Sequence, residues 1–189
     1  MSQSITVRRY AVASLVGLSF ILAGCTTTPP SNPWANKTVA DGNIIGASHV
    51  AAEGLFSQAS SALDPNKTLL VASFVNIDDL EQTSSFGRIV SQQFATKFTQ
   101  LGFQLIEMLL RKDIYIKQKG GEFLLSREVQ ELSQVHGAQA VIVGTYAVGA
   151  KSVFVTAKII NAKDSAVMAA FDYQLPVGSD TRQLLKTKS

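Results

Sequence analysis

Hydrophobic and polar positions along residues 66–177 follow an order typical of a mixed α/β fold. Residues 68–76 form a nearly continuous β-branched and apolar run, which predicts a strand buried on both faces. Residues 86–101 then place apolar side chains at helical spacing, and Gly102 is expected to end that helix in a left-handed conformation. Thr83, Ser84 and Ser85 are each suitable N-caps. The predicted inner face of the helix consists of Phe86, Ile89, Val90, Phe94, Phe98 and Leu101.

A second strand over residues 103–110 would complete a strand–helix–strand unit, whose crossover is expected to be right-handed and its strands parallel. Residues 113–125 then predict a short β-ribbon around the glycine turn at 119–121. Ser126 is placed to cap a second helix that ends at Gly137. The predicted inner face of this second helix is Val129, Leu132 and Val135.

The last part of the chain predicts an antiparallel meander. Residues 139–148, 151–161 and 166–175 form three strand-like runs joined by short turns. The middle run alternates strictly, with Val153, Val155, Ala157 and Ile159 on one face and Phe154, Thr156, Lys158 and Ile160 on the other. The fold class is therefore α/β (α+β): a mixed sheet with a β-α-β unit, a β-ribbon, a second helix and a C-terminal antiparallel meander, with helices packed on the sheet.

Residues 44–63 precede this core and predict an N-terminal helix. Apolar residues recur there every three or four positions, and Asp64-Pro65 is expected to end the helix because a residue before proline avoids helical geometry. His49 lies in this helix and is interpreted as a surface or half-packed residue. No second ligand-type residue stands beside it at a metal-binding spacing.

The first 25 residues have the three-part pattern of a secretory signal. Arg8 and Arg9 are followed by an apolar run from Ala11 to Ala23 and then by small residues before Cys25. The apolar run would span roughly 20 Å as a helix, short of the ~30 Å hydrocarbon core of a bilayer. A permanent membrane-spanning helix is therefore disfavoured for this segment.

Leu22-Ala23-Gly24-Cys25 resembles the lipobox of bacterial lipoproteins. The resemblance implies cleavage before Cys25, diacylglycerol on its thiol and an acyl group on its new amino terminus, giving an N-palmitoyl, S-diacylglycerol cysteine. The alternatives are an ordinary signal peptide that happens to contain a cysteine and a buried membrane anchor. Under the enterobacterial sorting rule, an aspartate directly after the lipidated cysteine keeps a lipoprotein in the inner membrane. Thr26 occupies that position here and therefore favours the outer membrane.

Residues 25–43 are rich in Pro, Ser, Thr and Asn, which predicts a lipidated flexible tether. Trp34 is the only tryptophan and has two interpretations. It is a chance apolar residue that packs on the domain or lies at the membrane interface, or it is a docking contact for a partner. The predicted organisation is a lipoprotein signal peptide (1–24), the tether (25–43), a folded domain (44–177, with core 66–177) and a C-terminal tail (178–189).

Composition narrows the possible functions without identifying one. The chain is 46% hydrophobic and 16% charged, which excludes a disordered chain. Its formal net charge is +3, and removal of Arg8 and Arg9 with the signal leaves 15 basic against 14 acidic side chains. Because no Lys/Arg cluster lies beyond the first ten residues, nucleic acid is not an expected partner.

Catalytic motifs are missing from the sequence, which contains no GxSxG elbow, P-loop or GxGxxG. His136 is interpreted as a last-turn residue favoured by the helix dipole, rather than a catalytic one. An acidic cluster before the residue 86–101 helix could bind a cation or supply a general acid or base, but a solvated loop is the simpler interpretation. That cluster is Asp78, Asp79 and Glu81, with Arg88 and Arg111 as candidate ion-pair partners.

Residues 71–94, 101–128 and 137–148 closely resemble the FlgO family of bacterial flagellar outer-membrane lipoproteins. The family domain is similar to the N-terminal domain of TolB-type and curli-secretion lipoproteins, which serves protein–protein contact. The resemblance implies structural importance, and no active site, for the residues that match the family motif. These are Phe74, Asp78, Thr83, Ser84, Ser85, Gly87, Arg88, Gly102, Phe103, Glu122, Ser126 and Arg127.

The implied function is that of a lipid-anchored, non-enzymatic module that assembles or stabilises the flagellum at the outer membrane and supports motility. Its expected partners are the outer membrane, other flagellar or envelope proteins and a second copy of itself, and no cofactor or metal is implied. Two alternatives stay open: a periplasmic adaptor for secretion or transport built on the same module, and an envelope enzyme that uses Asp78, Asp79 and Arg88.

Overall fold

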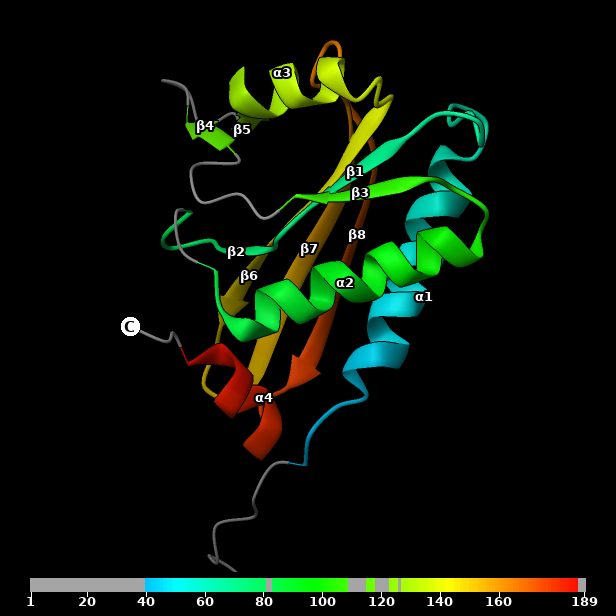
Figure 1. Ribbon diagram of the computed structural model, residues 1–189. Coiled ribbons are helices and arrows are strands. Elements are labelled where there is room, and N and C mark those ends of the chain that lie inside the picture. The colour runs from blue at the N-terminus through cyan, green and yellow to red at the C-terminus, as the bar shows by residue number, and fades with distance from the viewer. Residues whose placement is uncertain (1–39, 81–82, 109–114, 118–122, 126, 187–189) are drawn as a thin grey trace, which may run out of the picture. The chain divides into compact units, whose positions relative to one another are not determined.

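One mixed β-sheet organises the domain, and helices α1 (Ile44–Ala59) and α2 (Ser85–Gln100) lie across one of its faces (Figure 1). The computed structural model describes residues 40–80, 83–108, 115–117, 123–125 and 127–186. The strand order is β3-β1-β6-β7-β8, with β2 paired beside β6. The strands are β1 (Leu69–Ala72), β2 (Val75–Asn76), β3 (Leu105–Met108), β6 (Ala140–Val148), β7 (Ser152–Asn161) and β8 (Val167–Pro176).

The strand–helix–strand unit predicted from the sequence is confirmed. Strand β1 pairs in parallel with both β3 and β6, and α2 forms the crossover between β1 and β3. Strand β3 begins at Leu105, two residues later than predicted, because the backbone N–H groups of Gly102 and Phe103 still close the end of α2. The last two residues of the predicted strand, 109 and 110, lie outside the described part of the chain.

The predicted C-terminal meander is also confirmed. Strand β6 pairs antiparallel with β7, and β7 pairs antiparallel with β8. The predicted inward residues of β7, from Val153 to Ile159 at every second position, are buried, and Phe154 on the opposite face is half-exposed. Ile160 departs from this alternation because it is buried in a second hydrophobic cluster on the other face of the sheet.

The first predicted strand, 68–76, is wrong as a continuous element. It is divided into β1 and β2 at Ser73 and Phe74, and β2 pairs with the end of β6. The break occurs because the backbone N–H of Phe74 donates to the carbonyl of Gly87 on α2 instead of to a neighbouring strand. This interruption brings the sheet and the start of α2 into direct backbone contact.

The main core lies between the sheet and the two helices. Its largest fully buried side chains include four phenylalanines, and tilted ring contacts join Phe74 to Phe94 and Phe98 to Phe103. A smaller cluster is buried on the opposite face of the sheet. Its members are Leu70, Ala72, Val75, Met108, Val141, Val143, Ile160 and Ala162.

Helix α1 begins as predicted but ends earlier. The Asn43 side chain accepts a hydrogen bond from the Gly46 N–H at 2.9 Å and so caps the helix. The helix ends at Ala59 rather than at residue 63, because the N–H groups of Ala62 and Leu63 both turn back to the Ala59 carbonyl. On this helix Val50 is 59% exposed, whereas its neighbour Ala51 is buried.

A buried polar contact ties α1 to the edge strand β8. Ser48 is fully buried, and its hydroxyl lies 3.3 Å from that of Tyr173 on β8. Burial raises the pKa of Tyr173 to about 12, and the bond to Ser48 opposes this shift. The Gln58 side chain reaches the same strand and donates to the carbonyl of Ala170 at 3.0 Å.

Helix α2 largely confirms the sequence analysis. Ser84 is the cap among the three candidates, since its hydroxyl accepts from the Gly87 N–H, and Gly102 has a φ of 92°. The predicted inner face is wrong at Ile89, which is 37% exposed, and it left out Gln93, which is buried. Helical periodicity predicted the inner face of α2, but the packing of neighbouring elements determines which residues at the boundary of that face are buried.

Strands β4 (Tyr115–Lys117) and β5 (Phe123–Leu125) pair antiparallel, which confirms the predicted ribbon. Helix α3 (Arg127–Val135) follows, and Gly137 has a φ of 61°, as expected of a residue that ends a helix. Val135 was predicted to face inward, but it is 78% exposed because it lies on the outer side of the last turn. The glycine turn and Ser126 lie outside the described residues.

The predicted C-terminal tail contains helix α4 (Ser179–Leu185), which packs against α2. Its first turn is held by Asp41, which accepts hydrogen bonds from the N–H groups of Asp180 and Thr181 at 2.9 and 2.8 Å. Asp41 falls within the predicted tether, so the end of that segment is in fact bound to the domain. No helix-forming pattern marked α4 because its anchor lies far away in the sequence.

Candidate functional site

Six of the family-motif residues meet where strand β1 breaks and helix α2 begins: Phe74, Thr83, Ser84, Ser85, Gly87 and Arg88. The Thr83 hydroxyl donates to the Phe74 carbonyl at 2.7 Å, and the Phe74 N–H donates to the Gly87 carbonyl at 3.3 Å. A Cβ atom on Gly87 would lie 2.0 Å from the Phe74 carbonyl oxygen. Glycine is therefore required for the helix to approach the strand this closely.

The Phe74 ring fixes the other side of this junction. It is fully buried and lies 5.1 Å from the ring of Phe94, centroid to centroid. On β6, a Cβ atom at Gly144 would lie 2.2 Å from the Phe74 ring. Strand β6, the break after β1 and helix α2 are thus packed around one side chain, which explains the place of Phe74 in the motif.

Ser84 and Arg88 complete the start of α2. The Ser84 hydroxyl caps the helix, and the Arg88 guanidinium donates to the Ser85 hydroxyl at 3.1 Å. Burial raises the pKa of the nearby Tyr146, although hydrogen bonds to Ser84 and the charge of Arg88 lower it. The Tyr146 phenol therefore stays protonated at neutral pH, and its ring packs edge-on against Phe86 at 5.5 Å.

The acidic loop is exposed. Asn76 orders its first part, because its side-chain oxygen accepts from the Asp78 N–H at 3.1 Å and its carbonyl accepts from the Asp79 N–H at 3.2 Å. Both carboxyl-bearing residues face solvent. Within the described residues, His, Cys, Asp and Glu form no group of three able to hold a metal ion.

The two histidines lie on separate elements. His49 is half-buried on α1, as the sequence analysis expected. His136 is exposed and follows the last residue of α3 instead of lying within its last turn.

Several predicted site residues lie outside the described part of the chain. The lipidation site Cys25 is among them, so its modification stays a prediction. The described ranges also leave out Trp34, Glu81, Arg111, Glu122 and Ser126, so the predictions for these residues stay predictions.

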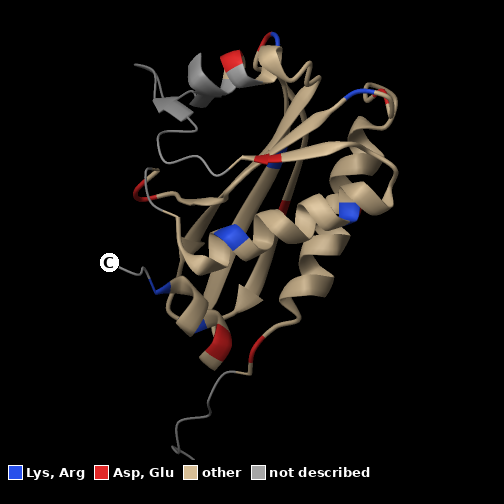
Figure 2. Ribbon diagram, in the orientation of Figure 1, with Lys and Arg blue, Asp and Glu red and all other residues tan. Residues whose placement is uncertain are grey.

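Charged residues are scattered over separate elements of the described structure (Figure 2). One ion pair joins the two covering helices, between Lys97 on α2 and Glu53 on α1. A second, between Lys67 and Asp64, spans 4.0 Å between exposed side chains. Pairs of this exposed kind contribute about 1 kcal/mol or less.

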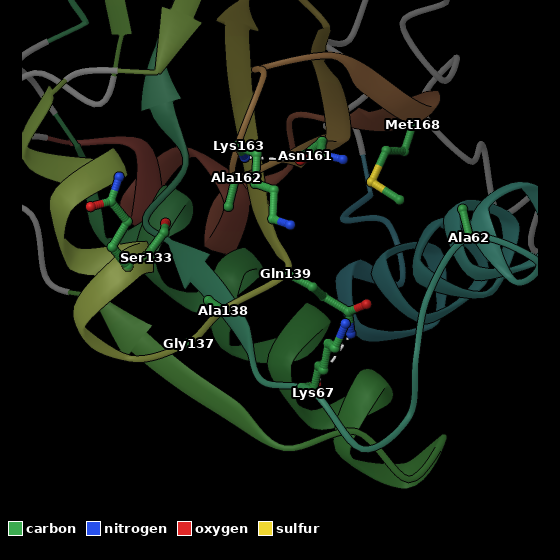
Figure 3. A pocket seen from close by; sticks show the side chains of 11 residues that line it. Ala62, Lys67, Ser133, Gly137, Ala138, Gln139, Asn161, Ala162, Lys163 and Met168 are labelled. Carbon is green, nitrogen blue, oxygen red and sulfur yellow. Dashed lines mark hydrogen bonds between the residues drawn. The ribbon is translucent and has the colours of Figure 1, made fainter.

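Two features escaped the sequence analysis. The first is Asp41, whose pKa is held well below its ordinary value of 3.8, chiefly by the backbone N–H groups of Asp180 and Thr181. The second is a pocket of about 390 Å³ at the end of the sheet where β6 begins (Figure 3). Neither had a detectable sequence signal, because each joins residues from distant parts of the chain.

The fold and the site together define a mixed α/β domain whose motif residues hold a sheet and a helix together. The family model described as FlgO protein matches residues 49–180. The chain belongs to the FlgO family. No curated protein matches it.

Solved structures with a similar fold have low sequence identity to the chain. The C-terminal domain of LpoB from Salmonella enterica aligns with a TM-score of 0.53 and 10% identity, over 73% of this chain and 100% of that one. The PelC dodecamer from Paraburkholderia phytofirmans aligns at 0.40 and 14%, over 62% and 75%. Lipoprotein GNA1162 from Neisseria meningitidis aligns at 0.40 and 12%, over 60% and 85%. The LpoB similarity supports the α/β fold.

None of the helices in the described ranges is both long and apolar enough to span a bilayer.

Proposed function

We propose that this chain is an outer-membrane lipoprotein, anchored through Cys25, that assembles or stabilises the flagellum where it crosses that membrane. The observation that carries the proposal is the FlgO family match over residues 49–180. The lipobox at residues 22–25 agrees with it independently, since it lies upstream of the matched segment.

The packing of the motif residues supports a non-enzymatic role. Phe74, Thr83, Ser84 and Gly87 bond or pack with one another, and their polar atoms are used in capping and backbone contacts. Catalysis by general acid or base requires a titratable group held within reach of a substrate. Of the motif's ionisable residues whose side chains the structure describes, Asp78 is exposed and Arg88 bonds to Ser85. In this proposal, the domain functions by binding other proteins with its surface.

The anchor explains how the module is held at the membrane. A single acyl chain binds a bilayer only marginally, whereas several chains add about 0.8 kcal/mol per buried methylene and hold firmly. A tether of Pro, Ser and Thr residues after Cys25 would let the domain stand away from the membrane surface. In the proposal, the domain faces the periplasm, where it contacts flagellar proteins.

Membrane fractionation and electron microscopy test the proposal together. The protein should fractionate with the outer membrane, and its N-terminal peptide should carry the mass of a triacylated Cys25. Cells that lack the gene should have fewer or unstable flagella. Normal flagella in the deletion strain, together with a defect in envelope secretion or transport, would favour the adaptor alternative and overturn the flagellar proposal.

A further inference from the structure

We propose that the pocket beside the start of β6 binds a small molecule that carries a carboxylate or phosphate group next to a short apolar portion. The proposal goes beyond the flagellar role and does not depend on it. The pocket has a volume of about 390 Å³, within the range of small-molecule sites in proteins.

Three connections converge to form this pocket, as Figure 3 shows. The segment between α1 and β1 contributes Ala62 and Lys67, and the segment between α3 and β6 contributes Gly137, Ala138 and Gln139. The end of β7, the turn after it and the start of β8 supply Asn161, Ala162, Lys163 and Met168. Ser133 and Gln134 at the end of α3 complete the lining.

Gln139 makes one wall of the pocket rigid. Its side-chain oxygen accepts from the Asp64 N–H at 2.8 Å, and its side-chain nitrogen donates to the carbonyls of Asp64 and Lys67 at 2.7 and 3.2 Å. Its backbone N–H and carbonyl are bonded as well, to Thr68 and Ala162. The backbone at Lys67 is therefore held at the rim by a hydrogen-bond network that exists without a ligand.

The β7–β8 turn is equally well ordered. The Asn161 side-chain oxygen accepts from the Lys163 N–H at 2.9 Å, and the Ala166 N–H donates to the Asp164 carboxylate at 3.0 Å. The Asn161 carboxamide nitrogen has no partner among the described residues, so it can donate to a ligand. The Lys163 side chain extends from the turn into the pocket (Figure 3).

Charge selects the class of ligand. Among the described residues that line the pocket, the charged ones are Lys67 and Lys163, and none is Asp or Glu. Asp64 forms an ion pair with Lys67, but the pair spans 4.0 Å between side chains that are 43% and 61% exposed. Two ammonium groups and a carboxamide donor around one hollow favour an oxyanion, which accepts charge-assisted hydrogen bonds.

An apolar surface lies beside these donors. Ala62, Ala138, Ala162 and the Met168 side chain line the pocket. Methionine adapts its shape to small apolar groups. A bare anion would leave this surface in contact with water, so the best ligand pairs the oxyanion with a short aliphatic group.

Calorimetric titration of the full lipidated chain in non-ionic detergent tests the site. The probes are N-acetyl-leucine, its neutral analogue N-acetyl-leucinamide, and inorganic phosphate. N-acetyl-leucine is expected to bind and the amide is not. Tighter binding of N-acetyl-leucine than of inorganic phosphate would support an oxyanion site with an apolar portion, whereas tighter binding of inorganic phosphate would overturn the apolar portion of the proposal.

Matched lysine variants make the test specific. Lys163→Met and Lys67→Met should each weaken binding about tenfold, because each removes a charged donor, and Lys163→Arg should retain it. Lys151→Met removes the same charge from the β6–β7 turn and should change the affinity by less than about twofold. The proposal is overturned if neither anion binds, if the neutral amide binds equally well, or if Lys151→Met weakens binding as much as Lys163→Met does.

Discussion

The carbonyl oxygen of Phe74 would lie 2.0 Å from a Cβ atom on Gly87, so the strand break and helix α2 meet without room for any side chain. The same carbonyl accepts from the Thr83 hydroxyl, and the Phe74 N–H donates to the Gly87 carbonyl. One contact therefore explains why Phe74, Thr83 and Gly87 all belong to the motif. The contact joins the sheet to the helix that forms the β-α-β crossover.

Gly87→Ala should destabilise the domain by about 3 kcal/mol, because the added methyl group meets backbone that cannot move aside. Helix propensity alone predicts the opposite sign, since alanine is about 1 kcal/mol better than glycine inside a helix. Urea unfolding followed by circular dichroism measures the difference.

Gly137→Ala is the matched control for this substitution. Gly137 has a φ of 61°, but a Cβ atom there meets nothing within 4 Å, so the cost should be only about 1 kcal/mol of backbone strain. A Gly87→Ala protein as stable as Gly137→Ala would show that the close approach to Phe74 is unimportant.

Acid should loosen helix α4 through Asp41. The pKa of Asp41 is lowered by the N–H groups of Asp180 and Thr181, so its ionised form favours the folded state. This contribution is fully present above the ordinary pKa of 3.8 and is lost as the pH falls towards the lowered value. Asp41→Asn keeps an acceptor oxygen but loses the charge.

The melting temperatures of the wild type and Asp41→Asn should therefore differ at neutral pH and converge in acid. Asp78→Asn, a change in an exposed carboxylate away from α4, provides the control and should give no such convergence. A difference between the wild type and Asp41→Asn that is constant across the titration would contradict the assigned role of the Asp41 charge.

Gln93→Leu should stabilise the domain. The Gln93 side-chain oxygen is buried on α2 and has no hydrogen-bond partner among the described residues. Leucine removes this unpaired group at similar volume, for an expected gain of about 1 kcal/mol. Gln92→Leu on the exposed side should change stability by less than about 0.5 kcal/mol. Thermal melts of the two variants and the wild type measure these differences. A Gln93→Leu protein less stable than the wild type would mean that the Gln93 amide makes a stabilising contact.

Local chemistry explains which parts of the fold were predictable. Ser84 and Gly102 mark the two ends of α2 through capping and a positive φ, which depend on neighbouring residues alone. The alternation in β7 was likewise visible, because it follows directly from the two faces of a strand.

Tertiary contacts explain what the sequence did not show. The break at Phe74 arises from a bond to Gly87, and the burial of Gln93 arises from the packing of neighbouring elements. Asp41 caps a helix almost at the other end of the chain. The pocket around Lys163 forms only when three connections meet. None of these relationships follows from periodicity along one segment.

A triple substitution of Asp78, Asp79 and Arg88 by alanine tests the enzyme alternative. The first two residues are exposed, and Arg88 bonds to Ser85. If the domain is a non-enzymatic module, cells carrying the variant should swim as the wild type does when protein levels are equal. Lost motility with a normally folded and located variant would instead require a functional role for this cluster.

The swimming of a gene-deletion strain that expresses Cys25→Ser tests directly whether motility requires the lipid anchor at Cys25. Serine keeps the size of the side chain but provides no thiol for diacylglycerol. The account predicts that the wild-type gene restores the swimming zone in soft agar and that Cys25→Ser, produced at the same level, does not. Full swimming with Cys25→Ser, or without the gene at all, would contradict the account of a lipid-anchored flagellar protein.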